Sequence, residues 1–367
     1  MKAPLRGQRE IQTLQSSFSV DSVVGRHACL FLLVFLFSCS DSPERLENND
    51  PSKYNISKDV LWSSPGGFDL TMDIYTPNSG PDKYPVIVMF HGGGRLVNDK
   101  SIMDQAAKYL ATNSRFVVCN VNYRLLADEG NTVRINQIVE DAFGAVVWVQ
   151  ENIARYQGDG TKVAVTGSSA GGHLAAMIVN MGHRLESESF RGERLGFKPS
   201  YLPTGTTAEA LAQRGGINVQ AAVLSYGAFD VYEGALGGFE RLTNLAWLFS
   251  GSIARGMFGN DINVVDNPAL YRAVSPPYNI PDAKERKLPP QMLTVGSLDM
   301  LVTPDSVKNY MRKLQSAGHP VQYWEHEGRP HAFLDSGSNI LLGISFEADA
   351  PPALDVMIDF LDEQFYP

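Results

Sequence analysis

The chain has 367 residues, of which 44% are hydrophobic and 19% are charged, and its formal net charge is −9. That length and apolar fraction suit one large domain with a sizeable core, and no internal repeat is visible. The acidic balance and the absence of a nucleic-acid-binding signature argue against a nucleic acid partner.

The N-terminal segment is typical of a bacterial export signal. Basic residues precede an apolar run over residues 28–37, which is too short to span a bilayer and has the length of a signal-peptide core. The sequence Leu36-Phe37-Ser38-Cys39 resembles a lipobox, in which the cysteine is lipidated and becomes the mature N-terminus. We therefore expect an exported, membrane-anchored bacterial lipoprotein that faces the periplasm or the cell surface. A cleaved soluble signal peptide and an uncleaved anchor are the alternatives.

These features divide the chain into three parts. We predict a lipoprotein-type signal peptide over residues 1–38, a polar tether over residues 39–57 and one large domain over residues 58–367. Cys119 lies in the large domain, within a predicted strand at residues 116–120. We expect it to be a small core residue, and we expect no disulfide.

A glycine-rich segment follows the second predicted strand. Residues 70–75 alternate between apolar and polar side chains before Pro77, which predicts a solvent-facing early strand. The apolar run 85–90 predicts a buried strand, and it ends in His91-Gly92-Gly93-Gly94. Successive glycines can direct their N–H groups into a cleft and stabilise an oxyanion, although a plain turn is the simpler interpretation. We expect His91 to shape this loop rather than to act as a base.

The chain then alternates between strands and helices. Residues 116–121 predict a buried strand, and the apolar spacing of residues 133–154 predicts a crossover helix. Such alternation implies an α/β fold with a mostly parallel sheet that is covered by helices on both faces.

A serine-containing pentapeptide lies at the next junction between a strand and a helix. Residues 162–166 predict the strand and residues 173–179 the helix, and Gly167-Ser168-Ser169-Ala170-Gly171 lies between them. This G-x-S-x-G pattern is that of a nucleophile elbow, in which Ser169 occupies a sharp turn with its Oγ exposed. The flanking glycines let the strand and the helix approach closely. We expect Ser168 to be a turn residue and His173 to be structural.

Two later strands are each followed by a residue suited to acid–base chemistry. Residues 291–295 predict a strand with Asp299 just beyond its end, and residues 321–325 predict a strand with His331 in the following loop. Ser169 therefore precedes an aspartate and a histidine, which is the order of the triad in α/β-hydrolases.

The alternatives to these two residues lie nearby. Asp305 is the second candidate acid, but it falls inside a helix that we predict from Thr303-Pro304 to about residue 317. His326 is the second candidate base, but an imidazole at the end of a strand is more often structural.

The last helix is predicted to open at Pro351-Pro352 and to end near Gln364.

Together, the ordered motifs resemble the α/β-hydrolase superfamily, and specifically its esterase/lipase branch that is similar to hormone-sensitive lipase. The resemblance covers about residues 58–365. It is carried by His91-Gly92-Gly93-Gly94, Asn122-Tyr123-Arg124-Leu125, Gly167-Ser168-Ser169-Ala170-Gly171-Gly172, Asp299-Met300-Leu301 and His331-Ala332-Phe333. The resemblance implies that the amides of Gly93, Gly94 and Ala170 form the oxyanion hole. It implies no metal and no organic cofactor.

Two stretches do not fit the alternation of strands and helices. Residues 183–217 are polar and are predicted to be an insertion after the nucleophile helix. Residues 229–288 are rich in aromatic and aliphatic side chains, and in the esterase scaffold this is the position of a helical cap. A surface excursion with its own small core is the alternative interpretation of the second stretch.

Two residues depart from the pattern of that branch. Many members carry Asp where this chain has Ser168, and an aromatic residue where it has Arg95. The Gly-Ser-Ser-Ala-Gly-Gly-His version is more similar to bacterial esterases that deacylate plant polysaccharides. Arg95 could face a substrate carboxylate, such as that of a uronic acid, or form a structural salt bridge, and we favour the salt bridge.

The resemblance implies a serine carboxylic-ester hydrolase that works through an acyl-enzyme. Ser169 would attack the ester, His331 would transfer the proton and Asp299 would orient the imidazole. We expect short acyl esters of carbohydrates, acetyl or feruloyl, as substrates. The alternatives are an exported lipase or general carboxylesterase, a serine peptidase similar to prolyl oligopeptidase, and a non-catalytic binding protein on the same fold.

Overall fold

An eight-stranded sheet forms the centre of the computed structural model, which describes residues 52–78, 83–192, 195–340 and 342–367. The strand order is β1-β2-β4-β3-β5-β6-β7-β8. The strands are β1 (Tyr54–Ser63), β2 (Leu70–Pro77), β3 (Tyr84–Phe90), β4 (Val117–Val121), β5 (Gly158–Ser168), β6 (Ala221–Ser225), β7 (Gln291–Gly296) and β8 (Val321–His326). β2 pairs antiparallel with β1 and β4, and every other neighbouring pair is parallel. The predicted α/β fold with a mostly parallel sheet is therefore confirmed.

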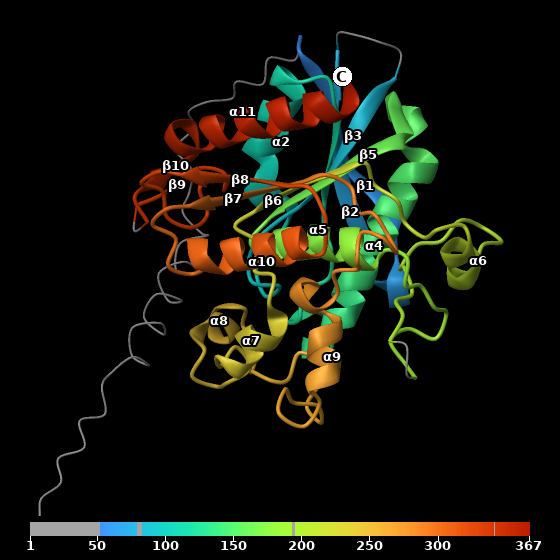
Figure 1. Cartoon of the computed structure of the whole chain (residues 1–367), viewed down its shortest axis with the longest axis vertical. Helices are drawn as coiled ribbons and strands as arrows, with labels where there is room; N and C mark the ends of the chain where they lie inside the picture. Colours follow the sequence, from blue (N-terminus) through green and yellow to red (C-terminus); the bar gives the residue numbers. More distant parts are fainter. Residues whose placement is uncertain (1–51, 79–82, 193–194, 341) are drawn as a thin grey trace, which may run out of the picture.

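Helices cover both faces of this sheet (Figure 1). On one face α2 (Asp104–Asn113) packs beside α11 (Phe346–Phe365). On the other lie α4 (Ile135–Asn152), α5 (Ala170–Met181) and α10 (Pro304–Ser316). Because both faces are covered, every residue of β3 and β4 is buried, which explains why these strands read as continuous apolar runs.

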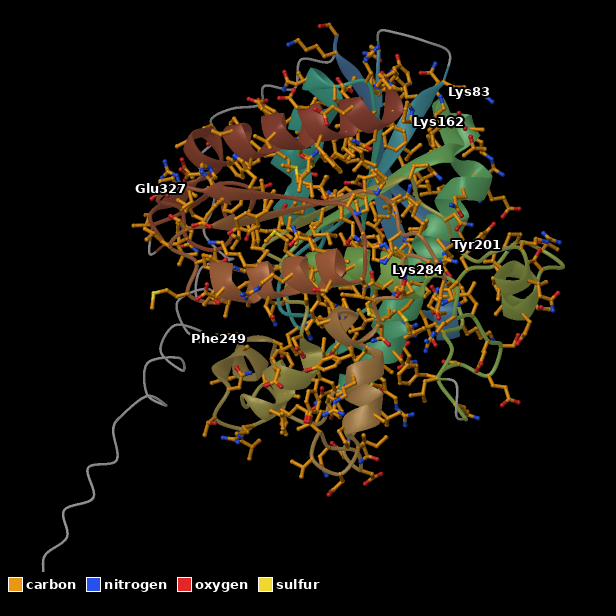
Figure 2. All side chains as sticks on the ribbon, in the orientation of Figure 1. Lys83, Lys162, Tyr201, Phe249, Lys284 and Glu327 are labelled. Atoms are coloured by element: carbon orange, nitrogen blue, oxygen red, sulfur yellow. The ribbon has the colours of Figure 1, made fainter. Side chains whose placement is uncertain are left out.

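Charged side chains mark the outer surface. Lys83, Lys162, Lys284 and Glu327 are exposed, and Figure 2 labels them on the surface of the molecule. Within the described ranges, no helix combines the length and the hydropathy that a membrane span requires.

The predicted tether extends too far into the fold. β1 begins at Tyr54, whose side chain is 3% exposed and whose ring lies 6.0 Å from that of Tyr75. Residues 54–57 therefore belong to the sheet, because this aromatic contact and pairing with β2 fix them. The predicted signal peptide, Cys39 and most of the tether lie outside the described residues.

The prediction of a solvent-facing early strand is wrong for β2. This strand lies between β1 and β4, and only Thr71 of its residues is not buried. β1 pairs along the outer edge of β2 and the helix α2 packs against it, and the alternation of residues 70–75 contains no information about either contact.

The last helix starts earlier than its prolines predict. α11 begins at Phe346, so that Pro351 and Pro352 lie inside it. Phe346 is buried in the core, and Asp349 accepts a hydrogen bond of 2.7 Å from the Ser345 N–H. Tertiary packing and this local hydrogen bond therefore extend the helix beyond the residue that proline rules favour.

The two insertions have different structures. The first, residues 183–217, contains the short helix α6 (Ala208–Gln213), and its Ser189 hydroxyl donates to Glu140 of α4 at 2.5 Å. The second, residues 229–288, folds into α7 (Val231–Leu236), α8 (Leu245–Phe249) and α9 (Pro268–Ala273). These three short helices lie together below α10 in Figure 1.

Candidate active site

The turn between β5 and α5 places Ser169 in a backbone conformation that residues with a Cβ rarely adopt. Its φ is 52° and its ψ is −113°. Two backbone hydrogen bonds hold the turn, because the Ser169 N–H donates to Ser225 O at 3.0 Å and its carbonyl accepts the Ala228 N–H at 3.0 Å. Strain of this kind persists only where the surrounding structure enforces it, and it is common at reactive residues.

Close backbone packing explains why glycine flanks this turn. A Cβ on Gly171 would lie 2.0 Å from Phe90 O, at the end of β3. A Cβ on Gly167 would lie 2.3 Å from the carbonyl carbon of Gly171. The elbow can therefore sit directly against the strand that leads into the glycine-rich loop.

Asp299 and His331 form a buried pair in the loops that follow β7 and β8. Asp299 Oδ2 lies 2.6 Å from His331 Nδ1, and the two residues are 3% and 4% exposed. The other carboxylate oxygen accepts the N–H groups of Leu301 at 2.9 Å and Val302 at 2.8 Å. The carboxylate is thus fixed on both sides, which holds the imidazole ring and sets which nitrogen faces away from it.

The glycine-rich loop packs against the elbow. Gly93 and Gly94 have φ values of 113° and 63°, and a Cβ on Gly93 would lie 2.1 Å from Val97 O. A Cβ on Gly92 would lie 3.4 Å from that of Ser169. Ala170 begins α5, where backbone N–H groups have no partner within the helix. This arrangement brings N–H donors of the kind that stabilise an oxyanion close to Ser169.

One cavity joins these parts. Its volume is about 810 Å³, and Gly93, Gly94, Ser169 and His331 line it. Residues of the second insertion, between Phe229 and Asn244, form much of the remaining wall. Because the insertion closes over the serine in this way, it has the position of a cap.

Comparison with known families matches residues 72–314 to the sequence model of the BD-FAE family. The chain belongs to the BD-FAE family. Carboxylesterase NlhH of Mycobacterium tuberculosis is 26% identical over 267 residues, which cover 73% of this chain and 72% of that protein. Esterase LipI of the same species is 28% identical, over 75% of this chain and 74% of the relative.

Solved structures show the same fold for this BD-FAE family member. Esterase 2 of Thermogutta terrifontis, phosphorylated by paraoxon, has a TM-score of 0.60 at 20% identity and covers 88% of this chain and 98% of its own. A truncated carbohydrate esterase from gut microbiota has a TM-score of 0.60 at 19% identity and covers 88% and 99%. The family and its relatives identify the chain as a carboxylic ester hydrolase of the α/β-hydrolase superfamily.

Asp305 and His326, the alternative acid and base, both lie away from the cavity that contains Ser169. Asp305 is exposed in the first turn of α10. His326 Nε2 lies 2.8 Å from Asp349 O, and its ring packs against Phe333. Neither residue lines the cavity around Ser169.

The two remaining histidines near the motifs have structural contacts. His91 stacks on the ring of Tyr123 at 4.3 Å, and burial lowers its pKa to about 4. His173 Nε2 lies 2.7 Å from Val274 O, and burial together with the charge of Arg95 lowers its pKa well below the usual value. Their burial and these contacts agree with the structural roles expected for both histidines.

Two residues that the sequence did not single out also contact this site. The Tyr226 ring meets the His331 ring edge-on at 4.8 Å, and its hydroxyl accepts the Leu334 N–H at 3.2 Å. Asp335 lines the cavity, and burial raises its pKa to about 7 against the opposing effect of His331. Sequence reasoning could have found Tyr226 from its position, because it directly follows β6. The carboxyl end of β6 lies beside those of β5 and β7.

The salt bridge that we favoured for Arg95 is not formed. Arg95 is 5% exposed, and no carboxylate in the described part of this chain lies within 4.0 Å of its guanidinium. Its Nη2 instead donates to Ala228 O at 3.0 Å. The sequence prediction was wrong because it could not identify which acids the fold would bring within reach.

Proposed function

We propose that this ester hydrolase acts through an acyl-enzyme formed on Ser169, with Asp299 and His331 as its catalytic partners. The observation that carries the proposal is that the strained Ser169 turn lines the same cavity as His331, whose Nδ1 lies 2.6 Å from the buried Asp299 carboxylate. No other serine of the described chain combines these two features.

Each step of the mechanism follows from that arrangement. Ser169 Oγ attacks the ester carbonyl while His331 takes the hydroxyl proton and later delivers it to the leaving alcohol. Asp299 holds the imidazole and stabilises its charged form. The N–H groups of Gly93, Gly94 and Ala170 bind the oxygen that becomes negative, and each such donor contributes about 3 kcal/mol to transition-state stabilisation. Water then attacks the acyl-enzyme by the same route and releases the acid.

Replacing the nucleophile tests this proposal. We expect Ser169→Ala to lower kcat for p-nitrophenyl acetate by about 10³-fold or more, because oxyanion donors and binding alone leave only residual catalysis. Ser168→Ala is the matched control, since its hydroxyl is buried and faces Met103 Sδ at 3.5 Å. The control should keep activity within about 10-fold. Full activity in Ser169→Ala would refute the assignment.

We further propose that the natural substrates are short acyl esters of carbohydrates. The similarity of the fold to a carbohydrate esterase from gut microbiota supports this, and so does a cavity of about 810 Å³, which can hold a small sugar ester. A polymeric substrate also suits the export and lipid anchoring that the sequence around Cys39 predicts.

A general carboxylesterase is the second candidate, and the relatives named carboxylesterase and esterase favour it. A panel of acetylated and feruloylated oligosaccharides, compared with p-nitrophenyl esters of increasing acyl length, separates the two. Higher kcat/KM for the sugar esters supports the carbohydrate substrate. Higher kcat/KM for simple alkyl or aryl esters supports the general carboxylesterase.

A further inference from the structure

Arg95 occupies an unusual place beside the nucleophile. It directly follows the three glycines of the loop and lines the same cavity as Ser169. Its backbone φ is 68°, a conformation that costs energy for a residue with a Cβ. The fold thus holds this side chain at the cavity wall despite a local penalty.

The guanidinium of Arg95 is buried with few partners. Nη2 donates to Ala228 O at 3.0 Å, whereas Nε has no hydrogen-bond partner among the described residues. Burial lowers the pKa of Arg95 to about 10, so that the group still carries its charge at neutral pH. A buried cation with one carbonyl partner is poorly compensated.

The other two buried arginines of the described chain are fully engaged. Arg124 donates from Nε and Nη2 to the two carboxylate oxygens of Asp141, both at 2.8 Å. Arg255 donates to the carbonyl oxygens of four residues, which are Asn131, Gly256, Leu126 and Val133. Arg95 therefore differs from the arginines that serve the fold, and it has donors left for another partner.

Backbone contacts place Arg95 next to the reacting group. Ala228, whose carbonyl accepts the Arg95 hydrogen bond, donates its own N–H to Ser169 O at 3.0 Å. Gly94, the neighbour of Arg95 in sequence, lines the cavity beside Ser169. An anion bound by Arg95 would consequently lie close to the ester carbonyl that Ser169 attacks.

Acidic residues of the cavity do not neutralise Arg95. Asp230 accepts the N–H of Glu233 at 3.0 Å as the cap of α7, and the Glu233 side chain is exposed. Asp335 is the third cavity acid, and burial raises its pKa to about 7. None of these carboxylates lies within ion-pair distance of Arg95.

We propose that Arg95 binds a carboxylate of the substrate, so that the preferred ester carries an anionic group near its scissile bond. The proposal rests on the proposed esterase function at Ser169. The carboxylate belongs either to the acyl part, as in a monoester of a dicarboxylic acid, or to the alcohol part, as in an acylated uronic acid. The recognition chemistry is the same, a charge-assisted hydrogen bond from a guanidinium to a carboxylate.

Two matched pairs of esters test the proposal with the full-length enzyme in a pH-stat. Monoethyl succinate is compared with ethyl 4-methylpentanoate, its uncharged isostere, for the acyl part. 4-Acetoxybenzoate is compared with its methyl ester for the alcohol part. In Arg95→Met, we expect the anionic-to-neutral ratio of kcat/KM to fall about 10- to 100-fold in one pair, as the loss of a charged hydrogen bond predicts. The affected pair identifies the part that carries the carboxylate.

Arg241 provides the matched control, because it lines the same cavity but is exposed. Arg241→Met should leave both ratios within about twofold, as expected for a screened surface charge. Unchanged ratios in Arg95→Met, or an equal fall in Arg241→Met, would overturn the proposal.

A measurement on the unmodified enzyme covers the case in which Arg95→Met does not fold. Succinate should inhibit the hydrolysis of ethyl 4-methylpentanoate competitively at a concentration at least about 10-fold lower than succinamide does. Equal inhibition by the two compounds would contradict the role of Arg95. If neither ester of either pair is hydrolysed, the proposed esterase function fails; if the neutral esters are hydrolysed and no anion effect is seen, only the role of Arg95 fails.

Discussion

At the scale of single residues, the site combines charges whose protonation depends on their burial. Asp335 illustrates this, because a carboxylate in a cavity wall loses hydration and its pKa rises to about 7. Its neighbour His331 partly opposes that rise. The protonation of this carboxyl group in the cavity wall therefore depends on pH near neutrality, although Asp335 does not belong to the proposed triad.

We predict that Asp335 makes the folded state less stable as the pH rises from about 4 to about 7. In that range the unfolded chain releases the proton of Asp335 while the folded chain retains it, so the unfolded state binds fewer protons and stability falls. Asp335→Asn removes this penalty. Relative to the wild type, the variant should gain on the order of 2 kcal/mol in unfolding free energy between pH 4.5 and pH 8.

Urea unfolding at the two pH values measures this gain. Ser306→Ala, a change at a residue of the same cavity that does not titrate, is the control, and its difference from the wild type should not vary with pH. A pH-independent effect of Asp335→Asn would show that the carboxyl group is not the source.

At the scale of elements, the junction of β3, β5 and α5 decides whether the site forms. The nucleophile turn and the glycine-rich loop belong to different strands, and they meet only because no side chain separates them at Gly171. The parallel pairing of β3 with β5 keeps the two strand ends level, with Phe90 opposite Gly167.

Gly171→Ala should therefore disturb both parts together. The added Cβ would lie 2.0 Å from Phe90 O and 2.7 Å from His91 O, and backbone atoms cannot yield as a flexible side chain can. We expect a loss of stability of about 1–3 kcal/mol and a fall in kcat with p-nitrophenyl acetate, because the loop or the turn must shift.

A second helical glycine provides the comparison. In Gly234→Ala, on α7, the new Cβ would meet nothing within 4 Å. Thermal unfolding of this variant should show a stability equal to or above that of the wild type, by up to about 1 kcal/mol, since alanine favours helix. Equal stabilities for the two variants would mean that the junction tolerates a Cβ.

The elements also show where local sequence rules fail. Alternation in residues 70–75 indicated a strand with one exposed face, yet β2 is buried between β1 and β4 with α2 packed against it. The prolines of α11 indicated a helix start, yet the burial of Phe346 outweighs them. In both cases contacts between distant segments decided the outcome, and a local pattern contains no information about them.

At the scale of the whole molecule, residues of the cap and of the loops at the carboxyl ends of the strands line the cavity that contains Ser169. The N-terminal sequence separately predicts that the enzyme is exported and anchored to a membrane. The described domain contains the complete proposed site, so anchoring and catalysis should be separable.

We predict that Cys39→Ser moves the protein from the membrane fraction to the soluble fraction when the chain is expressed in a bacterium that lipidates exported proteins. Esterase activity per molecule should not change, because Cys39 precedes the described domain. Fractionation followed by immunoblotting measures the change, with Cys29→Ser as the control that keeps the membrane location. Membrane retention of Cys39→Ser would contradict lipidation at this position.

The sequence by itself determined the fold class, the order of the motifs and the identity of Ser169, Asp299 and His331 as candidates. It could do so because strands and elbows depend on local patterns, and because the carboxyl ends of parallel strands meet at one edge of a sheet. Only the tertiary structure decided that β1 covers β2, that Tyr226 and Asp335 border His331, and that Arg95 is buried without a carboxylate. The physical reason is that burial and ion pairing depend on distances between segments far apart in the chain, which the fold as a whole sets.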